Sequence, residues 1–239
     1  MRPTSSTMFL LPQAPGRAAP RVGVVPAALV ATAACSCTNE RHVTRFVAMT
    51  GGPGAGKTAV LELARRGFCS HVRVLPEAAT MLFGGGFPRI PSREGLEAAQ
   101  RAIACVQREI ERSIASDGQT AMALCDRGTL DGLAYWPGPE EEYFLALGST
   151  RQQELERYAA VIHLRTPSSE HYDHSNPVRL ETAAHAQELD ARIAHAWRGH
   201  SRVHFVESQV DFMEKARRAL ELIQNELPSC CRHQPKGTP

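Results

Sequence analysis

The sequence has no strong excess of charge of either sign. Its 27 Lys and Arg residues are nearly balanced by 25 Asp and Glu residues, which leaves a formal net charge of +2. The basic residues are scattered along the chain, so no patch of the kind that binds nucleic acid is predicted. With 43% hydrophobic and 22% charged residues in a chain of 239, the composition is that of a soluble globular protein, and one domain is expected.

Cysteine spacing typical of a zinc finger is absent. The seven cysteines include no C-x-x-C pair, and none stands at zinc-like spacing with a histidine. We therefore expect free thiols, several of them in the core. Cys105 and Cys125 fall within apolar periodic segments, where cysteine behaves as a small hydrophobic residue. The pair His171 and His174 has no evident further ligands and is expected to lie on a loop surface.

From residue 43 onward, short apolar runs alternate with amphipathic stretches, which is typical of a parallel sheet with crossover helices. The predicted fold class is α/β, a five-stranded parallel sheet with helices on both faces. Periodic apolar residues predict helices over Glu94–Ser116 and Asp211–Leu227, whose stripes we interpret as packing surface. A third, Ala-rich helix is predicted over Glu181–Trp197. The predicted strands are Val43–Thr50, His71–Pro76, Thr120–Cys125, Ala159–Leu164 and Arg202–Val206.

The stretch "GGPGAGKT" after the first strand predicts a phosphate-binding loop. The pattern G-x-x-x-x-G-K-T, with a strand before it and a helix after it, is a strong signal. Backbone N–H groups and the helix N-terminus would face the phosphates, Lys57 would reach the β and γ phosphates, and the Thr58 hydroxyl would bind Mg²⁺. The predicted nucleotide-binding residues are Gly51, Gly52, Pro53, Gly54, Ala55, Gly56, Lys57 and Thr58.

Two further strand ends carry acidic residues. The apolar run Ala121–Cys125 ends in Asp126, at the edge where parallel sheets bind ligands, so Asp126 is a candidate Mg²⁺ ligand and Arg127 a candidate clamp for a phosphoryl or substrate group. The second strand ends in Glu77. This carboxylate can orient or deprotonate a hydroxyl substrate, or it can be an ordinary glutamate in the first turn of a helix.

Together, the segments "GGPGAGKT", "LPEAA", "CDRGTLDGLAYW" and "NPVRLE" resemble a P-loop family, often described as an AAA domain, that is typified by the ribosylnicotinamide kinase part of NadR. The resemblance covers about residues 45–227. It implies a P-loop NTPase three-layer sandwich similar to deoxynucleoside and thymidylate kinases. Asp126, Asp131 and Tyr135 make the match more specific than the P-loop alone.

The resemblance also implies roles for individual residues. In deoxynucleoside kinases, a Pro-Glu pair ends the second strand and supplies the base, and an acid-Arg pair ends the third strand; Glu77 and Asp126-Arg127 match these positions. Arg165 and Arg179 resemble arginines around the lid of such kinases. A lid arginine closes over the phosphates and excludes water. The sequence departs from the pattern in having only one clear lid arginine.

Residues 1–42 differ in composition from the rest of the chain. Up to Asn39 they contain no acidic residue, and the apolar run Val22–Ala34 is broken by Pro26 and too short to span a bilayer. The segment resembles a secretory signal or a transit peptide. Export is nevertheless disfavoured, because the nucleotide site that follows requires intracellular ATP or GTP. We expect a disordered leader, a cytoplasmic domain over residues 43–227 and a flexible tail over residues 228–239.

Two functions from different classes are compatible with these features. The first is an ATP-dependent kinase that transfers the γ-phosphoryl group to a hydroxyl of a small, nucleoside-like acceptor. The second is an ATP- or GTP-binding switch, or slow NTPase, that binds a partner or a lipid headgroup. The family resemblance favours ATP over GTP, and the sequence has no N-K-x-D motif of the kind by which GTPases read guanine. The identity of the acceptor and the oligomeric state cannot be read from the sequence.

Overall fold

The five predicted strands form one parallel sheet. In the computed structural model, which describes residues 35, 37, 41–167, 183–208 and 211–232, every neighbouring strand pair is parallel. The predicted strand boundaries are confirmed to within two residues. The strands, in the sheet order β2-β3-β1-β4-β5, are β1 (Arg45–Thr50), β2 (Val72–Leu75), β3 (Met122–Asp126), β4 (Ala160–Leu164) and β5 (Val203–Val206).

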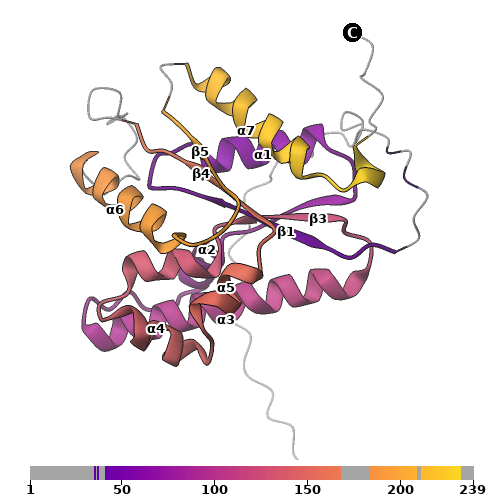
Figure 1. The fold of residues 1–239 in the computed structure, drawn as a ribbon. Coiled ribbons are helices and arrows are strands. Elements are labelled where there is room, and N and C mark those ends of the chain that lie inside the picture. The colour runs from indigo at the N-terminus through magenta and orange to yellow at the C-terminus, as the bar shows by residue number, and fades with distance from the viewer. Residues whose placement is uncertain (1–34, 36, 38–40, 168–182, 209–210, 233–239) are drawn as a thin grey trace, which may run out of the picture. The chain divides into compact units, whose positions relative to one another are not determined.

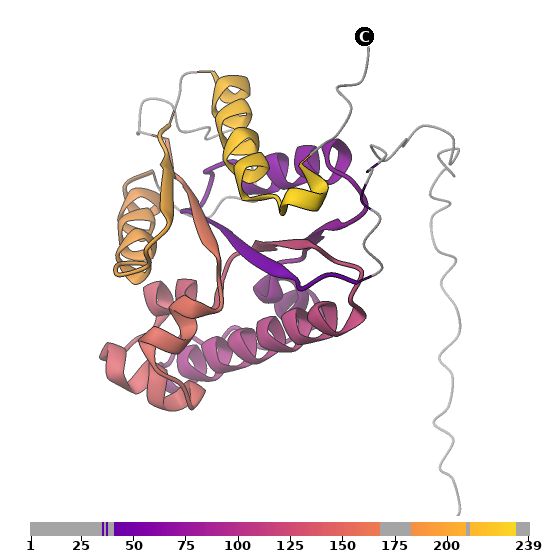
Figure 2. The ribbon, with the colours of Figure 1, turned by 45° about the vertical axis from the view of Figure 1, so that its right-hand side comes forward.

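Helices cover both faces of this sheet (Figure 1). On one face lie α1 (Lys57–Gly67) and α7 (Phe212–Glu226), which contact each other. The opposite face is covered by α3, the 3₁₀ helix η1 and α6 (Figure 2). The remaining bounds are α2 (Ala78–Gly84), α3 (Arg93–Asp117), η1 (Thr129–Tyr135), α4 (Glu140–Leu147), α5 (Arg151–Glu156), α6 (Ala183–Ala196) and the 3₁₀ helix η3 (Ser229–Cys231).

Side-chain alternation along the strands divides the core between these two faces. In β1, Val47 and Met49 belong to the cluster that α1 and α7 complete, whereas Ala48 faces the cluster of η1 and α6. All three residues are completely buried. A strand that is buried on both faces reads as a continuous apolar run, which is why these strands could be recognised in the sequence.

Helix α3 confirms the predicted long helix and corrects one detail of it. The Ser92 hydroxyl accepts a hydrogen bond from the Gly95 amide at 3.1 Å and caps the N-terminus. Cys105, which we expected to be an apolar core residue, is exposed. It follows the buried Ala104, and successive helical residues point about 100° apart. Cys125 is buried as expected.

The C-terminal segment departs from the predicted flexible tail. After Pro228 the chain turns into η3, and the side chain of Cys231 is fully buried in the core cluster of α1 and α7. Most of the predicted leader, and residues 168–182, which include most of the lid predicted over residues 166–178, lie outside the described residues. Among the helices that the structure describes, none has the length and hydrophobicity that a membrane span needs.

Candidate active site

The predicted phosphate-binding loop joins β1 to α1 at the carboxyl edge of the sheet. Gly51 and Gly56 have φ angles of 132° and 91°, which are accessible to glycine and strained for other residues. A Cβ atom on Gly51 would lie 2.1 Å from the Leu164 carbonyl oxygen. Helix α1 begins at Lys57, directly after Gly56. The loop therefore presents the N-terminus of α1, with its unpaired N–H groups, to the edge of the sheet.

Lys57 lies across this loop. Its Nζ atom donates hydrogen bonds of 2.9 Å to the carbonyl oxygens of Gly51 and Gly52. Burial and the nearby positive charge of Arg127 lower the pKa of Lys57 to about 7. An ammonium group in this position lacks a full negative counter-charge, so a phosphate beside it would restore the ordinary preference for the charged form.

Asp126 ends β3 beside Met49 of β1, as predicted. Its Oδ1 atom is buried and has no hydrogen-bond partner among the described residues. Burial, together with the negative charges of Glu77 and Asp131, outweighs the attraction of Lys57 and Arg127 and raises the pKa of Asp126 to about 6. A buried carboxylate oxygen without a donor fits a hard cation such as Mg²⁺, which prefers oxygen ligands. Thr58, in the first turn of α1, is exposed and can supply its hydroxyl.

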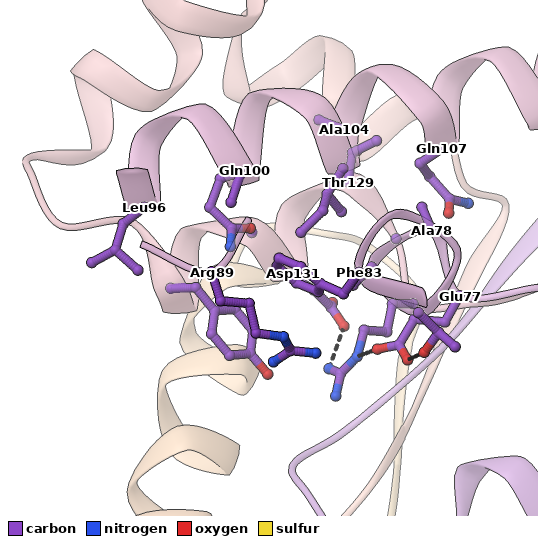
Figure 3. Close-up of a pocket in the computed structure, with 18 of the residues that line it drawn as sticks. Glu77, Ala78, Phe83, Arg89, Leu96, Gln100, Ala104, Gln107, Thr129 and Asp131 are labelled. Atoms are coloured by element: carbon purple, nitrogen blue, oxygen red, sulfur yellow. Dashed lines mark hydrogen bonds and ion pairs between the residues drawn. The ribbon is translucent and has the colours of Figure 1, made fainter. Parts of the chain in front are cut away.

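Arg127 connects the two acidic strand ends. Its Nε atom donates to Glu77 Oε1 at 2.6 Å, and its Nη1 atom donates to Asp131 Oδ2 at 3.2 Å (Figure 3). Among the described residues, Arg127 is the one non-glycine residue with positive φ, 74°. Such backbone strain is common at ligand sites, where surrounding contacts hold it in place. Arg127 thus fixes the orientation of Glu77 relative to β3.

Glu77 is ionised at neutral pH in this arrangement. Burial opposes the charge, but Arg127 and a 2.5 Å hydrogen bond from the Thr80 hydroxyl outweigh it and lower the pKa of Glu77. Asp131 is held in turn by the Thr50 hydroxyl and by the indole N–H of Trp197, both at 2.6 Å. A fully partnered Asp131 makes Arg127 a rigid support for the Glu77 carboxylate.

A cavity of about 450 Å³ opens beside Glu77 and Asp126. Figure 3 shows its wall of α3 residues, with Phe83 and Arg89 on the facing side. The guanidinium of Arg89 lies 4.0 Å from the centre of the Phe83 ring. The lining combines apolar surface with a few polar groups, as in most small-molecule sites. Its lining residues from α3 include Leu96, Ala99, Gln100, Ile103, Ala104 and Gln107.

The cavity corrects the interpretation of α3. We predicted that its whole apolar stripe is packing surface, yet Leu96, Ala99 and Ile103 line the cavity. Helical periodicity identifies the inward face of a helix, and the same pattern arises whether that face meets a core or a hollow. Tyr135, which belongs to the family resemblance, lines the cavity, and its neighbour Trp136 is buried.

Asp190, which we did not predict, holds the phosphate-binding loop from α6. Its Oδ1 atom accepts hydrogen bonds from the Gly52 amide and from His163 Nε2, both at 2.9 Å. Its Oδ2 atom lies 3.1 Å from Nη1 of Arg165. Burial opposes ionisation, but His163, the Gly52 amide and Arg165 outweigh it and lower the pKa of Asp190 to about 2.

Lys215 supports the same loop from α7 and was also not predicted. Its Nζ atom donates to the carbonyl oxygens of Ala55, at 2.9 Å, and Arg165, at 2.5 Å. Arg165, predicted as a lid arginine, also stacks on Phe205 at 4.5 Å. Arg179 lies outside the described residues. The described residues therefore bring together Lys57, Glu77, Asp126 and Arg127 at one edge of the sheet, with Arg165 at the end of β4.

Comparison with known proteins agrees with this geometry. A family model described as an AAA domain matches residues 46–215. No curated protein matches the chain. Among solved structures, thymidylate kinase from Candida albicans is similar at a TM-score of 0.50 and 13% identity, over 77% of this chain and 92% of that chain. At this identity the similarity concerns the fold alone, and it confirms the P-loop nucleotide kinase fold.

Proposed function

Because this chain belongs to the AAA domain family, we propose that it is an ATP-dependent kinase that phosphorylates a hydroxyl group of a small, nucleoside-like acceptor, as the ribosylnicotinamide kinase of NadR does. The observation that carries the proposal is the cavity beside Glu77 and Asp126. A nucleotide-binding loop alone needs no second cavity. A cavity at the same edge of the sheet gives an acceptor a place opposite the γ-phosphate.

The nucleotide occupies the phosphate-binding loop in this proposal. Lys57 exchanges the carbonyl oxygens of Gly51 and Gly52 for phosphate oxygens, which leaves its charge better paired. Thr58 and Asp126 would hold Mg²⁺, which neutralises charge on the β and γ phosphates when bound. Arg165 and Arg179 are the proposed lid arginines. GTP is the alternative nucleotide.

The acceptor hydroxyl lies against Glu77. Its oxygen forms the new bond to the γ-phosphorus while the bond between that phosphorus and the β–γ bridging oxygen breaks, and ADP leaves. The hydroxyl proton passes to the Glu77 carboxylate and then to water. Because the transition state of phosphoryl transfer is loose, orienting the hydroxyl matters more than basicity, and an ionised Glu77 of lowered pKa is adequate for this.

The chemistry of the cavity favours an acceptor with a flat ring. Ala99 and Ile103 supply apolar surface, while Gln100 and Gln107 supply amides. The Gln107 amide nitrogen donates to Glu111 Oε1 at 2.8 Å, which fixes the orientation of that side chain. Phe83 can stack on a ring. A volume of about 450 Å³ lies within the range that small-molecule sites span.

The test is ATP consumption by the full chain with Mg²⁺, alone and with a panel of nucleosides that includes nicotinamide riboside, followed by mass spectrometry of the products. We expect at least one nucleoside to accelerate consumption and to gain a phosphoryl group. If no acceptor changes the rate and bound nucleotide is hydrolysed slowly, the kinase proposal is wrong and the nucleotide-operated switch replaces it.

Glu77→Gln tests whether the Glu77 carboxylate acts on the acceptor. It should lower acceptor phosphorylation about 100-fold or more, while the Kd for Mg²⁺–ATP stays within about threefold, because Glu77 lines the acceptor cavity rather than the loop. The matched control is Glu94→Gln, which removes an equal charge from an exposed position at the start of α3. Equal activities of the two variants would remove Glu77 from the mechanism.

A further inference from the structure

Five of the seven cysteines gather at one place, together with two histidines. Cys69 and His71 lie in the turn between α1 and β2, Cys35 comes from the segment before β1, and Cys231 belongs to η3. One ligand atom from each of these four residues lies within 4.8 Å of all the others. We expected free thiols, and all seven cysteines are free in the structure, but their gathering with two histidines at one place was not predicted. They come from three separate segments of the sequence, so no spacing motif predicts the cluster.

The cluster lies at the opposite edge of the sheet from the nucleotide site. His71 immediately precedes β2, and Glu77 follows the end of the same strand. The His71 carbonyl accepts hydrogen bonds from the amides of Ala121, at 2.8 Å, and Met122, at 3.2 Å, which ties the turn to the start of β3. Its side chain is thereby presented at the amino edge of the sheet, away from the catalytic residues.

The ligand atoms of the four residues all lie within 4.8 Å of one another. Within this set, Cys231 Sγ lies 3.8 Å from His71 Nδ1. A zinc–sulfur bond of about 2.3 Å and a zinc–nitrogen bond of about 2.0 Å at a tetrahedral angle separate the sulfur from the nitrogen by about 3.5 Å. A disulfide would need a sulfur–sulfur distance of about 2.05 Å, and all seven cysteines are free thiols in the structure.

We propose that this cluster is a structural zinc site with three thiolates and one imidazole, provided by Cys35, Cys69, Cys231 and His71. Soft thiolates select zinc, copper(I) or iron–sulfur clusters, and a tetrahedral site of sulfur and nitrogen ligands fits zinc. Cys69 and Cys231 are at most 1% exposed. Four protein ligands leave no open position for substrate, which is characteristic of structural rather than catalytic zinc.

The neighbouring thiols and imidazole do not form an equally complete site. The other two groups of candidate ligands have three members each, and each shares one residue with the four-ligand set. The shared residues are His71 in the first group and Cys231 in the second. Cys37 Sγ and Cys230 Sγ lie 3.7 Å and 3.8 Å from the two nitrogens of His42. These partly buried residues lie beside the four ligands.

The site would join three separate parts of the chain. Cys35 brings the segment before β1, Cys69 and His71 bring the start of β2, and Cys231 brings the turn after α7. Among the described residues, the cysteine side chains of these parts meet through van der Waals packing and weak S–H hydrogen bonds, such as that from Cys35 Sγ to the Cys230 carbonyl oxygen at 3.8 Å. Removal of zinc should therefore loosen the amino edge of the sheet and leave the nucleotide site at the other edge in place.

The first experiment measures zinc by mass spectrometry in the full-length protein, purified without chelators and after removal of any histidine tag. We expect about one zinc per chain. Cys69→Ser should lose it, and Cys105→Ser should keep it, because Cys105 is an exposed thiol on α3 outside the cluster. Absence of zinc from the wild-type protein, or equal zinc in the two variants, overturns the proposal.

The second experiment remains informative if Cys69→Ser fails to fold. A zinc-selective chelator is applied to the wild-type protein, which should release the metal and lower Tm by on the order of 10 °C, while the Kd for Mg²⁺–ATP changes less than about threefold. Replacement by Co²⁺ should give the absorption of a tetrahedral cobalt–thiolate centre. Intramolecular disulfides in place of free thiols, or an octahedral cobalt spectrum, would contradict the site.

Discussion

Asp190→Asn tests whether the carboxylate on α6 stabilises the phosphate-binding loop. The substitution keeps the size of the side chain and an oxygen that can accept from the Gly52 amide, but it removes the negative charge. That charge faces His163 Nε2 at 2.9 Å and Arg165 Nη1 at 3.1 Å. The side chain is 7% exposed, so solvent screens these interactions weakly.

The magnitude follows from the pKa of Asp190. Its environment lowers this pKa from 3.8 to about 2. At about 1.4 kcal/mol per pKa unit, ionised Asp190 contributes about 2 kcal/mol to the free energy of unfolding. Because the folded-state pKa is the lower one, this contribution is complete well above pH 3.8 and is lost as the pH falls through about 2.

The assay is urea unfolding of wild-type protein and Asp190→Asn at neutral pH and again near pH 3. We expect a difference of about 2 kcal/mol, or about 5 °C in Tm, at neutral pH and about half of it near pH 3. The control is Glu188→Gln, an exposed position on the same helix. The idea that the charge of Asp190 stabilises the loop would be refuted if the difference in unfolding free energy does not shrink at acid pH, or if Glu188→Gln produces the same difference.

Two further predictions concern the nucleotide and acceptor sides of the site. Binding of Mg²⁺–ATP requires charged Lys57 and ionised Asp126, whose pKa values without ligand are about 7 and about 6. Near pH 8, Lys57 should therefore take up ~0.9 proton on binding, and near pH 6 Asp126 should release more proton than Lys57 takes up. Calorimetry in buffers of different ionisation enthalpy measures both quantities. Uptake that is independent of pH would contradict this. Arg127→Lys keeps the charge but loses the forked contact to Glu77 and Asp131, so acceptor phosphorylation should fall about tenfold or more, whereas Arg101→Lys, at an exposed position of α3, should have no effect.

Local features of the sequence were sufficient to predict that the candidate nucleotide-binding residues lie at one edge of the sheet. The phosphate-binding loop combines its glycines, Lys57 and Thr58 within eight consecutive residues. Asp126 and Glu77 could be placed because each follows an apolar strand, and parallel strands end at a common edge. Their positions are therefore consequences of strand direction and need no knowledge of distant contacts.

Residues that act across the fold could not be predicted in this way. Asp190 reaches Gly52 over 138 positions of the sequence, and Lys215 reaches Ala55 over 160. Each lies in an amphipathic helix, where a charged residue at a buried position resembles a charged residue on the exposed face until the packing is known. The cysteine cluster is a stronger case, because its members come from both ends of the described chain.

The two edges of the sheet therefore serve different physical purposes. At the carboxyl edge, Asp126 Oδ1 is buried and no described residue donates to it, and Arg127 is held at positive φ, so part of the stability of the fold is exchanged for readiness to bind a ligand. At the amino edge, ligand atoms from three chain segments converge within 4.8 Å. A metal there would strengthen the sheet without contacting substrate. Loss of zinc should consequently lower Tm while Mg²⁺–ATP affinity is retained. Asp126→Asn should instead raise Tm and weaken the binding of Mg²⁺–ATP.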